Sequence, residues 1–332
     1  MSSIATSAQP APAAARKASI FRIPWRVQRM MSREYFLERL TQRVFRGVYS
    51  TPAAVAEPGA ELEILSLLDK RNVANYLVTI KSFFLHSSKR PAVTVLSDGS
   101  LDASDVATLQ RHVRGIRVLE WKDVSLPASC PEATVKRWCT EYRYLAKLMY
   151  LPFAATRPLV MILDSDVVFR KPLGDIFDLR EGMAATYNCD HDHSIHDPHF
   201  NLFQEYAETR GISPIRNLNC GLMVWRREQI FPEKALEFLE FLSQRQGHLH
   251  AVAEQDAWSL LASPLPHAPL PAEFLVLSNW DLNTPANREA AATVHYVRGQ
   301  RYVTTNYLRD GRNIISALKR APLGVTWTAD NN

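Results

Sequence analysis

The chain has 332 residues, 46% of them hydrophobic and 22% charged, which is enough for one large globular domain with an extension. Its net charge of +5 is uneven, because the first 50 residues carry +7 and the rest of the chain carries −2. A nearly neutral body argues against nucleic acid as a partner. Four cysteines without metal-type pairing favour reduced thiols and a cytoplasmic location.

Residues 1–57 are expected to form a basic N-terminal extension. Residues 1–19 are rich in Ala, Pro and Ser, which is typical of disorder. From about Trp25 to Val48, apolar residues recur at helical spacing with arginines on the other side. This helix is consistent with peripheral membrane contact through residues 20–48, at the inner face of a membrane, or with packing on the body. An organelle transit peptide is a third alternative, whereas a secretory signal and a membrane-spanning stretch are not expected.

After a Pro- and Gly-containing linker at residues 51–59, strand-like and helix-like segments alternate. We expect strands at residues 62–68, 92–96, 116–121, 159–169, 183–187 and 217–226. Helices are expected at residues 75–86, 104–113, 232–245 and 254–262, with a long helix within 132–152. Residues 264–271 contain four prolines and are expected to be irregular loop. The alternation predicts an α/β domain with a mostly parallel sheet over residues 58–332.

The most informative motif is Asp164-Ser165-Asp166, which follows the apolar run 159–163. Such a run suits a strand buried on both faces, and ligands bind beyond the carboxyl ends of parallel strands. Two carboxylates there are costly unless a positive group neutralises them. A divalent cation shared with a substrate phosphate is one explanation, and an acidic turn that caps the next element is the other.

Further polar motifs follow this one. They are Asn219-Cys220-Gly221, Glu254-Gln255-Asp256, and His295-Tyr296 with Gly299 and Arg301. Together with Asp-Ser-Asp, which resembles an Asp-x-Asp motif, they resemble the GT-A glycosyltransferases, most closely glycosyltransferase family 8. The resemblance spans about residues 62–302 and implies a Rossmann-like GT-A fold and hexosyl transfer from a nucleotide-sugar, chiefly a UDP-sugar. A glycan, lipid-linked or protein acceptor would receive the sugar.

The resemblance also implies roles for single residues. The metal ligands would be Asp164, Asp166 and His295. The donor would be bound by Asp69, Lys147, Asp164 and Arg301, and the catalytic residues would be Glu254, Gln255 and Asp256. Imidazole beside carboxylates suits Mn²⁺ better than Mg²⁺, although either ion is consistent with the motif.

The family pattern is not followed everywhere. Aspartate is commoner at the position of Glu254, the glycine after His295-Tyr296 is displaced by the inserted Arg298, and Tyr302 stands where tryptophan is usual. These departures leave the stereochemistry open. Retention, with the amide of Gln255 beside the sugar, is preferred over inversion, which would need Asp256 or Glu254 as the base.

Residues 189–201 form a second unusual segment, with four histidines and three aspartates. Their spacing matches no structural zinc pattern. An acceptor-binding loop that includes His191 and His193, together with Asn219, is one interpretation, and a solvated polar loop is the other.

Two other functions fit parts of the sequence. A haloacid-dehalogenase-type phosphatase would use Asp164 as its nucleophile. However, about 100 residues of α/β pattern precede the motif, which normally opens such a domain. An inactive protein that binds sugar nucleotides and docks to membranes is the other alternative, and the presence of both aspartates and His295 argues against it.

Overall fold

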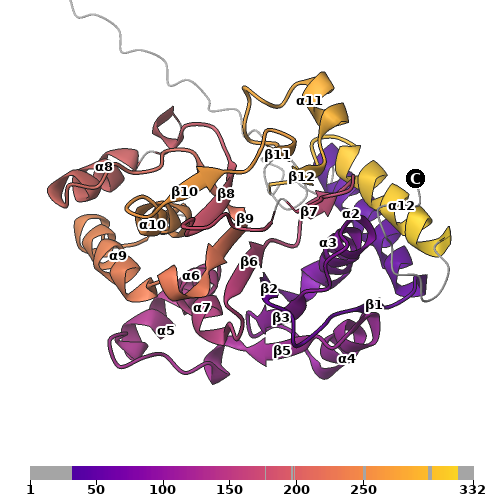
Figure 1. Cartoon of the computed structure of the whole chain (residues 1–332), viewed down its shortest axis with the longest axis horizontal. Helices are drawn as coiled ribbons and strands as arrows, with labels where there is room; N and C mark the ends of the chain where they lie inside the picture. The colour runs from indigo at the N-terminus through magenta and orange to yellow at the C-terminus, as the bar shows by residue number, and fades with distance from the viewer. Residues whose placement is uncertain are drawn as a thin grey trace, which may run out of the picture.

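A seven-stranded sheet forms the centre of this computed structural model, which describes residues 32–175, 177–195, 197, 199–249, 252–297 and 301–320 (Figure 1). The strand order is β10-β8-β9-β6-β2-β3-β5. In that order the strands are His267–Pro269, Ala185–Cys189, Leu218–Arg226, Leu159–Leu163, Leu62–Leu68, Ala92–Ser97 and Arg117–Glu120. β9 runs antiparallel to both of its neighbours, and the other pairs are parallel, so the expected mostly parallel sheet is confirmed.

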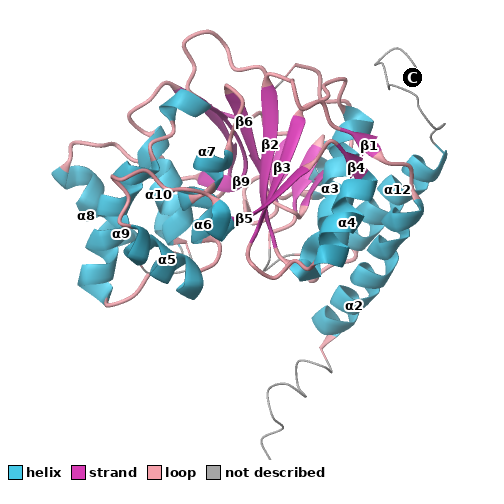
Figure 2. Cartoon of the chain, turned by 90° about the horizontal axis from the view of Figure 1, so that it is seen from below, coloured by secondary structure: helices cyan, strands magenta, loops and turns pink. Residues whose placement is uncertain are grey.

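Helices cover both faces of the sheet (Figure 2). Successive residues of a strand point to opposite faces, so the apolar run of β6 supplies two cores. Val160 and Ile162 lie in the first core, which helices α5 to α10 cover. Met161 and Leu163 lie in the second core, on the other face of the sheet, which α2, α3, α4 and α12 cover. The helices of the first core are α5 (Glu132–Glu141), α6 (Leu145–Met149), α7 (Leu151–Ala154), α8 (Phe200–Thr209), α9 (Pro232–Gln246) and α10 (Ala253–Ala262). Those of the second core are α2 (Arg33–Phe45), α3 (Val73–His86), α4 (Ala103–His112) and α12 (Asn306–Arg320).

Helix α2 packs on the body of the protein. It lies against α12 and α3, and Phe45 makes an edge-on contact with Tyr307 at a ring-centroid distance of 4.8 Å. The expected packing of the basic helix on the body is therefore seen for its buried side. Membrane contact of its exposed side stays a prediction. The expected disordered residues 1–19 and the expected start of the helix near Trp25 lie outside the described residues.

Local structure differs from the expectations in three places. The linker contains a short strand, β1 (Ala54–Val55), paired with β4 (Val113–Arg114), so α4 ends one residue earlier than expected. The proline-rich loop contains β10, which is tolerated because proline can occupy an edge strand. The single long helix expected within 132–152 is instead three short helices. The backbone leaves the helical region at Tyr142, which ends the first of them, and Pro152 stands in the first turn of the third, α7.

The strand expected at 159–169 is also divided, and this division builds the site. β6 ends at Leu163, and β7 (Val167–Phe169) belongs to a separate three-stranded sheet with β12 (Thr293–His295) and β11 (Phe274–Val276). Asp-Ser-Asp is the connection between the two sheets. The amide of Asp164 donates to the carbonyl of Gly221 (2.8 Å), and the hydroxyl of Thr79 donates to the carbonyl of Ser165 (2.9 Å). The connection is therefore held from both sides.

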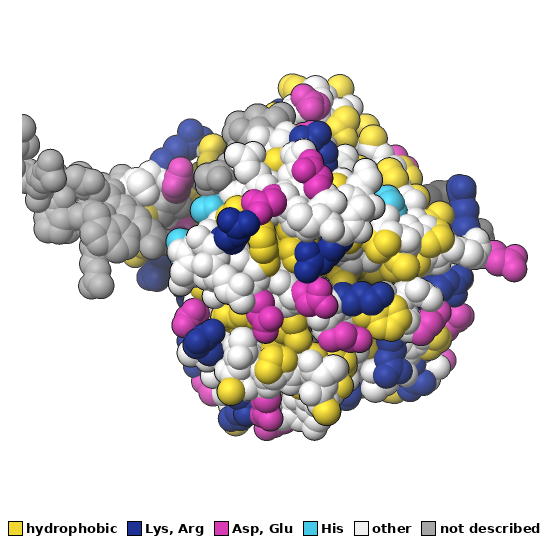
Figure 3. All heavy atoms as spheres, turned by 90° about the vertical axis from the view of Figure 1, so that its left-hand side faces the viewer, with side chains coloured by type: hydrophobic (Ala, Val, Ile, Leu, Met, Phe, Trp, Pro, Cys, Tyr) yellow, Lys and Arg dark blue, Asp and Glu magenta, His cyan; other side chains and the backbone are white. Residues whose placement is uncertain are grey.

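The remaining described elements are η1 (Arg46–Ser50), η2 (Lys70–Asn72), η3 (Trp121–Asp123), η4 (His193–Ile195), η5 (Arg227–Gln229) and α11 (Pro285–Ala290). Within the part of the chain that the structure describes, no helix combines the length and the apolarity needed to cross a membrane. On the face that carries α8 and α9, acidic and basic side chains are interspersed (Figure 3). This mixture agrees with the nearly neutral charge of the body.

Candidate active site

Asp164, Asp166 and His295 come together beyond the carboxyl end of β6. Each offers one ligand atom, and these atoms lie within 4.8 Å of one another. Nε2 of His295 is 3.2 Å from Oδ1 of Asp166 and 3.9 Å from Oδ2 of Asp164. Burial alone would lower the pKa of His295, but the two carboxylates, Asp166 first, outweigh it and raise the pKa. The predicted metal ligands therefore form one cluster.

The position of His295 follows from the small sheet and from β9. In the antiparallel pair of β12 and β7, His295 lies opposite Val167, next to Asp166 in the chain. Its Nδ1 is 2.9 Å from Oδ1 of Asn219, an oxygen that also accepts from the amide of Gly221 at 2.9 Å. Because that oxygen is an acceptor, the neutral imidazole carries its proton on Nδ1 and turns the lone pair of Nε2 toward the carboxylates.

These residues fit a divalent cation. Two carboxylates and an imidazole nitrogen are a donor set that suits Mn²⁺ and related ions. The outer hydrogen bond from His295 to Asn219 is the kind that orients a ligating histidine. Asp166 and His295 are buried and Asp164 is partly exposed, so the cluster faces solvent on one side only.

Two cations flank the cluster. The guanidinium of Arg301 forms an ion pair with Oδ2 of Asp166, across 135 residues of sequence. Nζ of Lys147 lies 2.9 Å from Asp164 and 3.3 Å from Oε1 of Glu254. Burial alone would lower the pKa of Lys147, but Asp164, and after it Cys220 and Glu254, raise it well above its ordinary value. Burial alone would raise the pKa of Asp166, but Arg301 and His295 lower it. Both cations stay charged, as anion binding requires.

A chain of hydrogen bonds joins the cluster to the histidine-rich segment. Asn219 donates from Nδ2 to Oδ2 of Asp190 (3.0 Å) and to Oε1 of Gln255 (3.3 Å). Nε2 of Gln255 is 2.7 Å from Nε2 of His193. His191 lies 2.9 Å from Asp190 and stacks on Trp280, with ring centroids 5.1 Å apart. The structure thus brings Asn219, His191 and His193 to the same end of the sheet as Gln255.

Asp190 and Trp280 were not among the predicted site residues. Asp190 is buried and also accepts a hydrogen bond from Ser278 (2.7 Å). Burial would raise its pKa, but the bonds from Ser278, the His191 amide and Asn219 lower it. A sequence signal for Asp190 did exist, because it directly follows β8 just as Asp164 directly follows β6. Trp280 lies in a loop without any such signal.

The three predicted catalytic residues point in different directions. Gln255 faces Asn219 and His193, whereas Glu254 accepts from Trp258 (2.9 Å) and contacts Lys147. Asp256 is completely buried, with Oδ1 3.8 Å from Nδ1 of His193, and burial chiefly raises its pKa to about 6.

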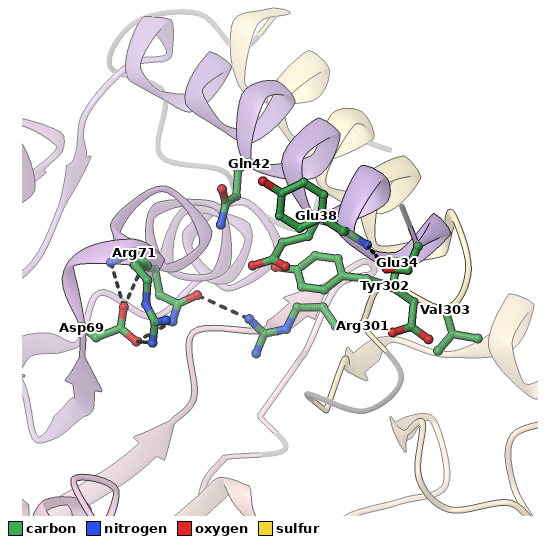
Figure 4. A pocket seen from close by; sticks show the side chains of 11 residues that line it. Glu34, Glu38, Gln42, Asp69, Arg71, Arg301, Tyr302 and Val303 are labelled. Atoms are coloured by element: carbon green, nitrogen blue, oxygen red, sulfur yellow. Dashed lines mark hydrogen bonds and ion pairs between the residues drawn. The ribbon is translucent and has the colours of Figure 1, made fainter. Parts of the chain in front are cut away.

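Asp69, the last predicted donor residue, caps the turn after β2. Its Oδ1 accepts from the amides of Arg71 (2.7 Å) and Asn72 (3.1 Å). Its Oδ2 accepts from Nδ2 of Asn72 (2.9 Å), and Oδ1 of Asn72 accepts from Arg301 (3.3 Å), as Figure 4 shows. Asp69 is therefore connected to the cluster through Asn72 and Arg301.

Solved structures of glycosyltransferases share this fold. The galactosyltransferase LgtC, solved with donor and acceptor sugar analogs, aligns with a TM-score of 0.50 at 16% identity, over 78% of this chain and 97% of LgtC. An active-site mutant of LgtC, with glutamine replaced by glutamate, aligns with a TM-score of 0.53 at 16% identity over the same shares. The bifunctional glycosyltransferase WbbM aligns with a TM-score of 0.52 at 13% identity, over 78% of this chain and 50% of WbbM.

The chain has the GT-A glycosyltransferase fold. This confirms the expected fold class and argues against the phosphatase alternative. No protein-family model and no curated protein matches the sequence. Membership of glycosyltransferase family 8 in particular therefore stays a prediction.

Proposed function

We propose that this protein is a metal-dependent glycosyltransferase that moves a sugar from a nucleotide-sugar, chiefly a UDP-sugar, to a glycan, lipid-linked or protein acceptor. The observation that carries the proposal is the cluster of Asp164, Asp166 and His295, flanked by Arg301 and Lys147, at the carboxyl edge of a GT-A sheet. The two carboxylates and the imidazole would hold a divalent cation, and the two cations would bind a diphosphate attached to it.

The chemical difficulty in sugar transfer is the charge that develops on the departing diphosphate. Asp164, Asp166 and His295 would hold Mn²⁺ or Mg²⁺, which as a Lewis acid stabilises that charge when bound. Arg301 and Lys147 are placed to donate charge-assisted hydrogen bonds to phosphate oxygens. Glu254 contacts Lys147, so it positions that cation rather than acting as a base.

Retention of the anomeric configuration is the stereochemistry we propose. The side chain of Asp256, the carboxylate that an inverting reaction would need, is completely buried, and Glu254 is held by Lys147 and Trp258. Gln255 instead presents an amide among Asn219 and His193. The leaving phosphate would then accept the proton of the acceptor. NMR of the new linkage tests this, and an inverted product would contradict it.

The acceptor is assigned to the side of the site that carries Asn219, His191 and His193. Trp280, stacked on His191 and 55% exposed, adds an aromatic face of the kind on which sugar rings pack. Asp190 orients both His191 and Asn219 through hydrogen bonds.

A peripheral membrane contact is proposed for the exposed side of α2. Phe36 is 65% exposed there, beside the exposed arginines Arg33, Arg39, Arg43 and Arg46. Each such cation contributes about 1 kcal/mol near an anionic leaflet. Binding to vesicles with and without phosphatidylserine, for the wild type and a variant with Arg39, Arg43 and Arg46 changed to Glu, tests this contact. Equal binding of the two proteins would contradict it.

The activity is tested by hydrolysis of UDP- and GDP-sugars with Mn²⁺, combined with thermal shift. We expect the wild type to hydrolyse at least one sugar donor and to lose this activity in EDTA. Asp166→Ala should abolish both the activity and the shift in melting temperature caused by Mn²⁺. Asp123→Ala, which removes an exposed aspartate of η3, is the matched control and should behave as wild type. Activity that survives EDTA unchanged would refute the metal site.

A further inference from the structure

A cavity of about 560 Å³ lies between α2 and the turn after β2 (Figure 4). Its walls come from three segments that are far apart in sequence. Glu34, Glu38 and Gln42 line it from α2, Asp69 and Asn72 from the turn after β2, and Arg301 from the segment before α12. Its volume is within the range of about 300 to 1,000 Å³ that is usual for small-molecule sites.

The cavity begins where the metal cluster ends. Arg301 belongs to both, because its Nη2 pairs with Asp166 while its Nη1 donates to Oδ1 of Asn72 at 3.3 Å. A diphosphate held by the cluster and by Arg301 would therefore direct the group attached to its far end into this cavity. In a nucleotide-sugar one end carries the sugar and the other the nucleoside. The proposed sugar side, beside Gln255, reaches the cluster through Asn219 and His295, whereas the cavity reaches it through Arg301 and Asp166. The nucleoside is therefore the group that we expect to enter the cavity.

The chemistry of the walls suits a nucleoside. Glu34, Glu38 and Asp69 offer carboxylate oxygens, and Gln42 and Asn72 offer amides. Carboxylates accept hydrogen bonds, so they match a ligand rich in donors, such as ribose hydroxyls and the N–H groups of a base. Asp69 already accepts three hydrogen bonds from its own turn.

Helix α2 presents three different sides, and one of them faces the cavity. Leu37, Thr41 and Phe45, spaced four residues apart, are buried against the body. Phe36, Arg39 and Arg43 are exposed to solvent. Glu34, Glu38 and Gln42, again spaced four residues apart, line the cavity, and the side chain of Glu38 points toward that of Tyr302 (Figure 4). Both acidic residues of α2 thus lie on its cavity side.

We propose that α2 forms one wall of the nucleoside part of the donor site, with Glu38 and Gln42 as residues that contact the donor nucleoside. This inference rests on the proposed function. It makes the N-terminal extension a specificity element of the enzyme in addition to any role of its exposed arginines.

The test compares UDP, GDP and inorganic pyrophosphate, each with Mn²⁺, by isothermal titration on the full-length protein. Pyrophosphate reaches only the cluster and its two cations, whereas the nucleoside diphosphates also reach the cavity. We expect Glu38→Ala and Gln42→Ala each to weaken the preferred nucleoside diphosphate about tenfold and to leave pyrophosphate unchanged, as loss of one such hydrogen bond predicts. Arg39→Ala, on the solvent side of the same helix, is the matched control. Glu38→Gln keeps the shape of the side chain and serves as the second variant if Glu38→Ala lowers the melting temperature.

Three outcomes would overturn the proposal. If the wild type binds UDP or GDP and the α2 variants bind it equally well, α2 does not contact the nucleoside. If the variants lose pyrophosphate as much as the nucleoside diphosphate, the effect comes from the cluster. If the wild type binds pyrophosphate with Mn²⁺ but neither nucleoside diphosphate, the nucleotide-sugar function itself fails, and this inference fails with it.

Discussion

A β-carbon on Gly221 would lie 2.1 Å from Cε1 of His295. No side chain at this position would tolerate that distance. Only a glycine in β9 leaves room for the imidazole ring of His295. The same residue fixes the cluster in a second way, because its carbonyl accepts from the amide of Asp164 at 2.8 Å. Gly221 therefore holds one metal ligand through its backbone and admits another through its missing side chain.

Gly221→Ala should displace the ring of His295 and weaken Mn²⁺ binding at least tenfold, because a metal site depends on ligand positions within a few tenths of an ångström. Titration of Mn²⁺ followed by thermal shift measures this loss. Gly59→Ala, at a glycine where an added β-carbon would meet nothing within 4 Å, is the control. Unchanged Mn²⁺ affinity in Gly221→Ala would show that His295 is not a ligand.

Arg301→Ala removes the cation that joins the cluster to Asn72. Because this contact strengthens as the leaving group gains charge, kcat/KM should fall by about 100-fold. Steady-state kinetics of the preferred nucleotide-sugar measures the fall. Arg210→Ala, at an exposed arginine paired with Glu237 near the end of α8, should have no effect. A structure with UDP in which Arg301 and Lys147 both point to bulk solvent would contradict the assignment.

Asp256 should make the stability of the protein depend on pH. Its pKa is raised to about 6 by burial and, more weakly, by Asp197, while His193 lowers it. The unfolded carboxyl releases its proton near its ordinary pKa of about 4, so the free energy of unfolding falls as pH rises from about 4 to about 6. Asp256→Asn removes the titrating group and with it this pH-dependent loss of stability. Its stability relative to wild type should therefore increase between about pH 4.5 and pH 7, by at most about 3 kcal/mol.

Urea unfolding of both proteins across that pH range measures the difference. A difference in unfolding free energy that is constant with pH would show that Asp256 does not titrate between pH 4.5 and 7.

Phe45→Ala should destabilise the whole protein. Phe45 is completely buried against Tyr307, and a β-carbon on Gly311 would lie only 2.0 Å from its ring. Removing a buried phenylalanine costs about 3 to 5 kcal/mol, because it also leaves a cavity. Phe36→Ala, nine residues earlier on the exposed side, should change stability by less than about 0.5 kcal/mol. Denaturant unfolding compares the two variants, and equal effects would mean that α2 is not part of the folded body.

Much of the central sheet could be predicted from the sequence, because its strands are continuous apolar runs. β2, β3 and β9 lie within one residue of the expected segments. The short elements could not be predicted. β1 and β4 have two residues each and β10 has three with a proline, which is too little for any periodic pattern. These strands exist because a neighbouring backbone lies beside them.

The sequence by itself determined the position of Asp164 and Asp166, since the apolar run before them places both carboxylates at the carboxyl edge of a buried strand. Only the tertiary structure decided which other residues contact these two carboxylates. His295 comes beside Asp166 through the pairing of two three-residue strands, and Arg301 reaches it across 135 residues. Helical periodicity also separates only an apolar from a polar side, so it could not show that Glu38 faces a cavity. Such contacts depend on the packing of distant segments, for which local spacing contains no signal.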